Sequence, residues 1–206
     1  MTAQPSQLEA AADILRHNGV AVFPTDTVYG IGAALGSTAG IRKLYACKKR
    51  PLDQPTAVLI SSVDQLQELT DSMISGKLKL LLADCWPGAL TIILPQSRTS
   101  RFAEGLKLIC GSQGKIGIRL PDHDLTRSLI SMLDEPLVAS SANTKGALAP
   151  TARTALEPEL EKAVDIILDG TCGSGISSTV LDLTTTPYTI IRAGEVTAEQ
   201  ISRYLD

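Results

Sequence analysis

Histidine and paired cysteine are scarce in this sequence of 206 residues. It has two histidines and four cysteines, and no two cysteines have the CxxC spacing of a zinc site. Neither His17 nor His123 has an acidic or thiol cluster beside it in the sequence. These gaps argue against a zinc centre and against Ser-His-Asp or Cys-His catalysis. Any chemistry must then proceed without an obvious imidazole base.

Long apolar runs and a strong net charge are missing as well. The longest apolar runs, such as 78–83 and 89–95, are far shorter than the roughly 18 residues of a membrane span. Residues 1–19 lack the pattern of a signal peptide, so we expect a cytoplasmic protein with no membrane partner. Because the formal net charge is −3, a site for a nucleotide or nucleic acid must come from local clustering.

The composition and the order of the hydrophobic patterns are those of a globular α/β protein. With 44% hydrophobic and 20% charged residues, the chain fits one domain, 1–206. Strands are predicted at 20–23, 56–60, 89–94, 115–120, 137–140, 166–168, 179–183 and 189–192. Helices are predicted from a capping box at Ser6, at 39–48, 62–69, 78–85 and 125–133, and from Thr197.

Strands and helices alternate until two strands follow each other near the C-terminus. This order predicts an α/β sandwich whose sheet mixes parallel and antiparallel strand pairs. The polar, glycine-bearing segment 96–114 is predicted to be a flexible loop.

Two polar segments directly follow predicted buried strands, where ligand-binding loops gather in α/β sheets. The first, 24–32, reads PTDTVYGIG and brings together Thr25, Asp26 and Thr27. The second, 139–143, reads ASSAN. Both segments are consistent with ligand binding, but hydroxyl groups that close their own turn, or a helix cap, explain the same residues.

Cationic side chains form a further candidate site. Five basic residues and no acid occur within 42–50, and the pair Lys48 and Arg50 precedes a proline. Such a pair suits a triphosphate, although a solvated helix face is the commoner role of a charge run. Arg119 lies in an apolar strand, where it needs a partner, either a carboxylate ligand or an internal salt bridge.

Taken in order, the segments PTDTVYGIG, KKRP, WPGALT, IRLP, SSAN, STV and IRAG resemble those of the YrdC family of threonylcarbamoyl-AMP synthases. The resemblance runs from about Gly19 to Gly194. It implies an open, twisted mixed parallel/antiparallel sheet with flanking helices and a positively charged concave face. It further implies a nucleotidyltransferase that joins L-threonine, bicarbonate and ATP, with Mg²⁺ carried by the triphosphate. The implied downstream partner is a complex that transfers the threonylcarbamoyl group to tRNA.

The resemblance also assigns the site residues, with no metal ligand among them. ATP-binding positions fall on Lys48, Arg50, Lys115, Ala139 (through its backbone), Ser141, Asn143 and Arg192. Of these, Lys48, Arg50, Ser141 and Asn143 take the catalytic roles. Threonine-binding positions fall on Thr25, Thr27, Arg119 and Thr179.

The chain departs from the common family pattern at Gln54, Leu59 and Ala149, which bears on substrate affinity more than on reaction class. Its length fits a short form without an extra C-terminal domain. The alternatives are a double-stranded RNA-binding module, carbamoyl transfer to another acceptor as in hydrogenase-maturation proteins, and a paralogue with little synthase activity. The acidic net charge and the few aromatic residues disfavour RNA binding.

Overall fold

The computed structural model describes residues 5–74, 76–144 and 146–205. Within them, the strands are β1 (Ala21–Phe23), β2 (Gly30–Ala34), β3 (Ala57–Leu59), β4 (Leu90–Pro95), β5 (Lys115–Arg119), β6 (Leu137–Ser141), β7 (Ile166–Ile167), β8 (Thr179–Asp182) and β9 (Thr189–Arg192). The α-helices are α1 (Pro5–Arg16), α2 (Thr38–Cys47), α3 (Leu66–Leu69), α4 (Gly76–Cys85), α5 (Ala103–Cys110), α6 (Asp124–Leu133), α7 (Pro158–Ala163) and α8 (Ala198–Leu205). Short 3-10 helices are η1 (Val63–Gln65), η2 (Gly111–Gln113) and η3 (Arg153–Ala155).

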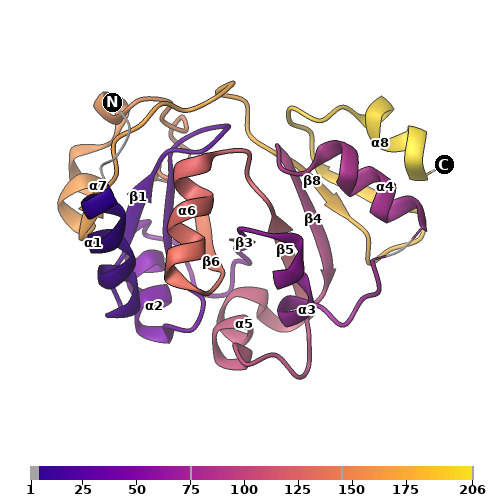
Figure 1. Cartoon of the computed structure of the whole chain (residues 1–206), viewed down its shortest axis with the longest axis horizontal. Helices are drawn as coiled ribbons and strands as arrows, with labels where there is room; N and C mark the ends of the chain where they lie inside the picture. The colour runs from indigo at the N-terminus through magenta and orange to yellow at the C-terminus, as the bar shows by residue number, and fades with distance from the viewer. Residues whose placement is uncertain (1–4, 75, 145, 206) are drawn as a thin grey trace.

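The strands form one sheet in the order β7-β1-β2-β6-β3-β5-β4-β8-β9. The pairs β1–β7, β3–β5 and β4–β8 are parallel, and the other neighbouring pairs are antiparallel. The prediction of a mixed sheet with flanking helices is therefore confirmed. Figure 1 shows α1, α2 and α7 toward one end of the long axis, and α4 and α8 toward the other.

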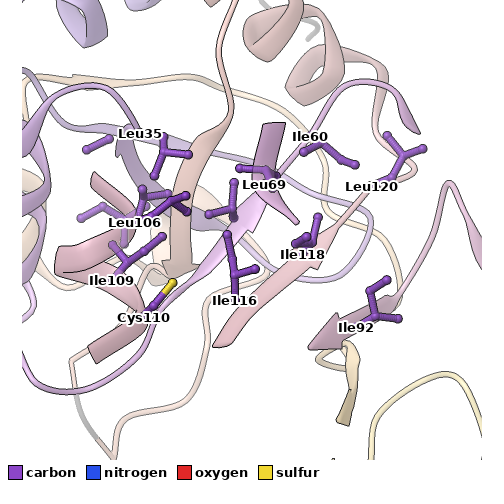
Figure 2. Packing of buried hydrophobic residues seen from close by; sticks show 14 of the residues in the cluster. Leu35, Ile60, Leu69, Ile92, Leu106, Ile109, Cys110, Ile116, Ile118 and Leu120 are labelled. Atoms are coloured by element: carbon purple, nitrogen blue, oxygen red, sulfur yellow. The ribbon is translucent and has the colours of Figure 1, made fainter. Parts of the chain in front are cut away.

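Each face of the sheet carries its own hydrophobic cluster. On one face, Ile92, Ile116 and Ile118 belong to one cluster with α5 residues such as Leu106 and Ile109, and Figure 2 shows Ile116 on the side of Ile109 and Ile92 farther away. On the other face, α1 and α6 cover strand residues of β1, β2, β3 and β6. Burial on both faces removes apolar surface from water and is the main force that fixes the layers.

Strand β5 shows how the uncovered part of the second face becomes polar. Its Ile116 and Ile118 point into the larger cluster. Successive side chains of a strand point to opposite faces, so Lys115, Gly117 and Arg119 point the other way. That side of β5 therefore presents two cations separated by a glycine.

The prediction of a flexible loop over 96–114 is wrong, because the segment contains α5 and η2. Leu106, Ile109 and Cys110 are buried at helical spacing. The helical spacing of these residues was the available signal. It is masked by the polar residues before it and by two glycines after it, which are typical of turns. The segment contributes to the core rather than to a mobile edge.

Two further elements were not predicted, and one predicted helix cap is wrong. Strand β2 occupies the GIG stretch that the sequence analysis assigns to a ligand-binding segment, and the sequence analysis predicts no helix where α7 forms. Gly30 lies so close to the Phe23 ring that an added Cβ would be 2.8 Å away, so close packing against β1 requires glycine there. Ser6 lies inside α1, which begins at Pro5, and is therefore not its cap.

Two local predictions at helix ends are confirmed. Thr197 and Gln200 form a reciprocal capping box, with N···O distances of 2.9 and 3.2 Å. Helix α4 ends at Cys85, and the buried Trp86 indole donates to the carbonyl of Leu90. In the described part of the chain, every helix falls short of the length and apolarity that crossing a membrane requires.

Candidate active site

A cavity of about 420 Å³ lies on the polar part of the second sheet face. Its walls come from β2, β3, β4, β5, β6, β8 and β9 and from the segments that join them. Eight of the eleven predicted site residues line it: Thr25, Thr27, Arg50, Lys115, Arg119, Ala139, Ser141 and Arg192. The tertiary structure thus gathers side chains that are up to 167 positions apart in the sequence (from 25 to 192). Lys48, Asn143 and Thr179 are not among the lining residues.

The turn that follows β1 is closed by the hydroxyl of Thr25. Its Oγ1 accepts from the backbone N–H groups of Thr27 and Val28 and donates to the Val28 carbonyl at 2.6 Å. The alternative that a hydroxyl satisfies its own turn therefore holds for Thr25. Because its proton goes to Val28, the 3.0 Å contact with Thr27 uses the proton of Thr27. Thr27 then faces the pocket as an acceptor.

Arg119 is the most constrained cation of the pocket, and only 7% of its surface is exposed. Its Nε donates to the Gly88 carbonyl at 3.0 Å, one Nη donates to Thr27 Oγ1 at 3.0 Å, and the other to Asp26 Oδ1 at 2.6 Å. The internal salt bridge is thus present, and the guanidinium still lines the pocket. Since the group has five N–H donors, two remain for a ligand.

A left-handed residue separates Lys48 from Arg50. Lys49 has φ of 50°, and Arg50 N–H donates to the Tyr45 carbonyl, which ends α2 in a tight C-terminal turn. Arg50 consequently enters the pocket wall, where an Nη donates to the Pro55 carbonyl. Its Nε is buried, and it has no hydrogen-bond partner among the described residues. An unpaired donor of this kind is suited to an anionic ligand.

Lys48 points to the other side of this turn and is 6% exposed. Its ammonium donates to the carbonyls of Ser141 and Asn143, at 2.5 and 2.6 Å. The Asn143 amide nitrogen donates to the carbonyls of Thr144 and Ala147. In this structure Lys48 and Asn143 therefore hold the backbone that follows β6, and Ser141 faces the pocket.

Burial lowers the pKa of the Lys48 ammonium. Desolvation, followed by the charge of Arg50, lowers the pKa of Lys48 from its ordinary 10.5 to about 8, against the opposite effect of Glu157. Between these two values an unfolded chain binds a proton that the folded chain has released, so unfolding takes up a proton. The free energy of unfolding should therefore rise with pH in that window, by at most roughly 1.4 kcal/mol per pH unit.

Urea unfolding of the wild type and of Lys48→Met between about pH 7 and about pH 10 measures this rise. The wild type should gain stability relative to the variant above about pH 8, where the neutral amine still offers two N–H groups to the two carbonyls. A difference that stays constant with pH would contradict this titration.

The pocket wall contains an acid, Asp182, that the sequence analysis does not predict. Asp182 accepts from Thr184 N–H at 2.8 Å, from Thr184 Oγ1 at 2.6 Å and from Lys115 Nζ at 3.1 Å. Burial alone would raise the pKa of Asp182, but these hydrogen bonds outweigh burial and lower it. Alternation along β8 was the available signal, because Val180 and Asp182 line the pocket together.

The same alternation takes Thr179 away from the pocket. Its side chain is fully buried, and its hydroxyl donates to the Val196 carbonyl at 2.6 Å. The preceding Ser178 lines the pocket instead. Arg192 donates to the Ser178 carbonyl at 2.7 and 3.0 Å and to its hydroxyl at 3.0 Å, which fixes the guanidinium at the pocket wall.

The pocket has a positive surplus despite the acidic chain. Its charged lining residues are Arg50, Lys115, Arg119, Arg192 and Asp182. Such a surplus in a concave site favours anionic ligands. Within the described ranges, His, Cys, Asp and Glu side chains do not gather in groups of three or more that could hold a metal ion.

Comparisons with known proteins identify relatives of the whole described sheet. The family model Sua5_yciO_yrdC, described as telomere recombination, matches residues 13–194. The chain is 39% identical to a threonylcarbamoyl-AMP synthase of Bacillus subtilis over 199 residues, which are 95% of this chain and 55% of that protein.

Two solved structures extend the comparison. The crystal structure of Pyrococcus abyssi Sua5 complexed with L-threonine has a TM-score of 0.88 and 31% identity, and the match covers 96% of this chain and 57% of that one. Escherichia coli YciO has a TM-score of 0.84 over 96% of this chain and 94% of its own, but at 23% identity it supports the fold alone.

The chain spans about half the length of the Bacillus relative and of the Pyrococcus structure. The match nevertheless includes the seven motifs and the whole described sheet. This chain therefore belongs to the Sua5/YciO/YrdC family, as the order of its motifs predicted.

Proposed function

We propose that this protein is an ATP-dependent nucleotidyltransferase that makes threonylcarbamoyl-AMP from L-threonine and bicarbonate and releases pyrophosphate. The observation that carries the proposal is a single pocket with two kinds of anion site. Arg119 offers two N–H donors beside the acceptor Thr27, and Arg50 lies on another wall with an unpaired Nε. The names of the Bacillus and Pyrococcus relatives support the same substrates.

The reaction is one that positioning and charge neutralisation can accelerate. The ammonium of threonine loses one proton to solvent, the resulting neutral amine attacks bicarbonate carbon, and water leaves to give a carbamate. A carbamate oxygen then attacks the α-phosphorus of ATP, the bond to the bridging oxygen breaks, and pyrophosphate departs with its electron pair. Phosphoryl and nucleotidyl transfers depend mainly on orientation and electrostatic stabilisation, so the lack of a histidine base is no obstacle.

The residues of this chain have distinct roles in the proposal. Arg119 binds the threonine carboxylate, and Thr27 accepts from its ammonium or hydroxyl group. Arg50 and Arg192 neutralise the phosphates, and Ser141 contacts them from the segment that Lys48 holds in place. Mg²⁺ would arrive with the triphosphate and would neutralise part of its charge.

The decisive experiment uses labelled threonine, bicarbonate and Mg-ATP with the purified protein. Mass spectrometry should detect threonylcarbamoyl-AMP, and omission of bicarbonate should abolish it. Absence of this product in the complete mixture would refute the proposal. Salt-dependent binding of double-stranded RNA without pyrophosphate release would favour the RNA-binding alternative instead.

Arg50→Ala should lower threonine-dependent pyrophosphate release by about a hundredfold or more, because a phosphate clamp is worth a few kcal/mol at the transition state. Lys49→Ala is the matched control, since Lys49 is exposed and pairs with Glu159 at 3.1 Å outside the pocket. Its turnover should match that of the wild type. Equal turnover in both variants would remove Arg50 from the reaction.

Transfer to tRNA by a partner complex, direct RNA binding, a cytoplasmic location and the single-domain organisation of residues 1–206 stay predictions. Leu59, one of the departures from the family pattern, lines the pocket. The same assay measures the effect of Leu59 on threonine affinity. It therefore distinguishes an active synthase from a weakly active paralogue.

A further inference from the structure

The carboxylate of Asp26 forms a nearly buried ion pair with Arg119 at the amino-acid end of the pocket. The Oδ1 to Nη distance is 2.6 Å, and the side chains of Arg119 and Asp26 are 8% and 14% exposed. Burial on both sides means that solvent screens this pair only weakly. Asp26 itself is not among the lining residues, so it acts on a ligand through its field and through Arg119.

A backbone clip, formed by residues 25–27 and 173–175, fixes the turn that bears this carboxylate. The N–H groups of Gly173, Ser174 and Gly175 donate to the carbonyls of Thr25, Asp26 and Thr27, at 3.1, 3.2 and 3.0 Å. Three consecutive bonds hold the turn against the segment that precedes β8. The clip holds the backbone of Asp26, and the 2.6 Å contact with Arg119 holds its carboxylate.

The ion pair divides the pocket by charge. Arg119 and Asp26 offset each other, which reduces the positive charge at their end of the pocket, although Arg192 is close enough for its guanidinium to be repelled by that of Arg119. Among the described residues, no carboxylate lies within salt-bridge distance of Arg50 or Arg192, so these two keep their positive charge for an anion. One cavity thus combines a place where a carboxylate offsets a cation, at Arg119, with a place where a cation keeps its full charge, at Arg50.

We propose that Asp26 is a specificity-determining residue that makes this end of the pocket select a zwitterionic amino acid over an anionic acid of the same shape. The inference rests on the proposed function, in which threonine binds at Arg119. A zwitterion has no net charge, and its ammonium is attracted by Asp26 and can donate to the Thr27 oxygen. An acid without the amine has no ammonium to interact with Asp26, and Asp26 offsets part of the attraction between Arg119 and the anion, which lowers the affinity for that acid.

Calorimetry with two ligands tests this selection. L-Threonine is compared with 2,3-dihydroxybutyrate, in which a hydroxyl replaces the amine, on the wild type and on Asp26→Asn. Asparagine keeps an oxygen that accepts from Arg119 but removes the charge. The wild type should prefer threonine by roughly tenfold or more, and the variant should lose about tenfold of that preference, with the anionic acid binding more tightly than before.

Asp169→Asn is the control, because it removes a carboxylate from the exposed pair with Arg153 outside the pocket. It should leave the ratio of the two affinities as in the wild type. A purely structural role of Asp26 predicts equal loss for both ligands in Asp26→Asn, and that result overturns the inference.

Two other results are equally decisive. Wild-type protein that binds dihydroxybutyrate as tightly as threonine overturns the inference even if Asp26→Asn does not fold. Wild-type protein that binds no threonine removes the proposed function together with this inference, whereas threonine binding with an unchanged ratio in Asp26→Asn overturns only the inference.

Discussion

Arg119→Met is expected to abolish threonine-dependent pyrophosphate release and to destabilise the protein at the same time. The variant loses the fork that would bind the threonine carboxylate, and loss of one such donor lowers kcat by about 10²–10³. It also leaves Asp26 nearly buried without its partner, which costs roughly 3–5 kcal/mol of unfolding free energy. Pyrophosphate release and urea unfolding measure the two effects separately.

A double substitution separates the two consequences of losing Arg119. Arg119→Met with Asp26→Asn removes the unpaired charge, so stability should recover while turnover stays low. Nucleotide affinity should change little in both variants, because Arg50 and Arg192 remain. If folded Arg119→Met kept wild-type turnover with threonine, the amino-acid site would have to lie elsewhere in the pocket.

Gly173→Ala is expected to disrupt the turn that bears Asp26 and Thr27. A Cβ at Gly173 would lie 1.9 Å from the Asp26 carbonyl oxygen and 2.7 Å from its carbon. Backbone cannot yield as a flexible side chain does, so the three-bond clip has to open or shift. We expect a loss of about 1–3 kcal/mol in the free energy of unfolding. The affinity for threonine should fall more than the affinity for the nucleotide.

Ser174→Ala provides the neighbouring control. Its hydroxyl donates to Glu195 and accepts from Ile176 N–H at 3.2 Å, both at the exposed surface, and its backbone N–H to Asp26 is retained. The change in stability should stay within about 0.5 kcal/mol. Thermal unfolding and threonine calorimetry of both variants compare the effects. If Gly173→Ala bound threonine as well as Ser174→Ala does, the clip would not be what positions the turn.

The alternation of side chains along a strand explains which site residues can be predicted from the sequence. In β5, alternation of Ile116 and Ile118 with Lys115, Gly117 and Arg119 is visible in the letters alone. In β8, the same rule places Thr179 with the buried Leu181 and leaves Asp182 on the pocket side. Motif order carries no information on the alternation of side chains along a strand, so it points to Thr179 and not to Asp182 as a site residue.

Glycine residues and polar flanking residues explain why β2 and α5 are not predicted from the sequence. Strand β2 begins with glycines whose missing side chains hide the alternation, and its pairing with β1 and β6 reveals it as a strand. Helix α5 is framed by turn-forming residues, and the burial of Leu106 and Ile109 against the sheet shows its role. In both cases contacts distant in sequence decide the local conformation.

By itself, the sequence determined the mixed α/β class, most helix and strand positions and the family, because periodic burial and ordered motifs are local properties of the chain. Only the tertiary structure decided which way each cation points. Lys48 and Arg50 are two positions apart, yet the left-handed Lys49 sends one to backbone carbonyls and the other to the pocket. Likewise the pairing of Arg119 with Asp26 joins residues 93 positions apart, and such long-range charge pairing depends on the folded distance rather than on either residue type.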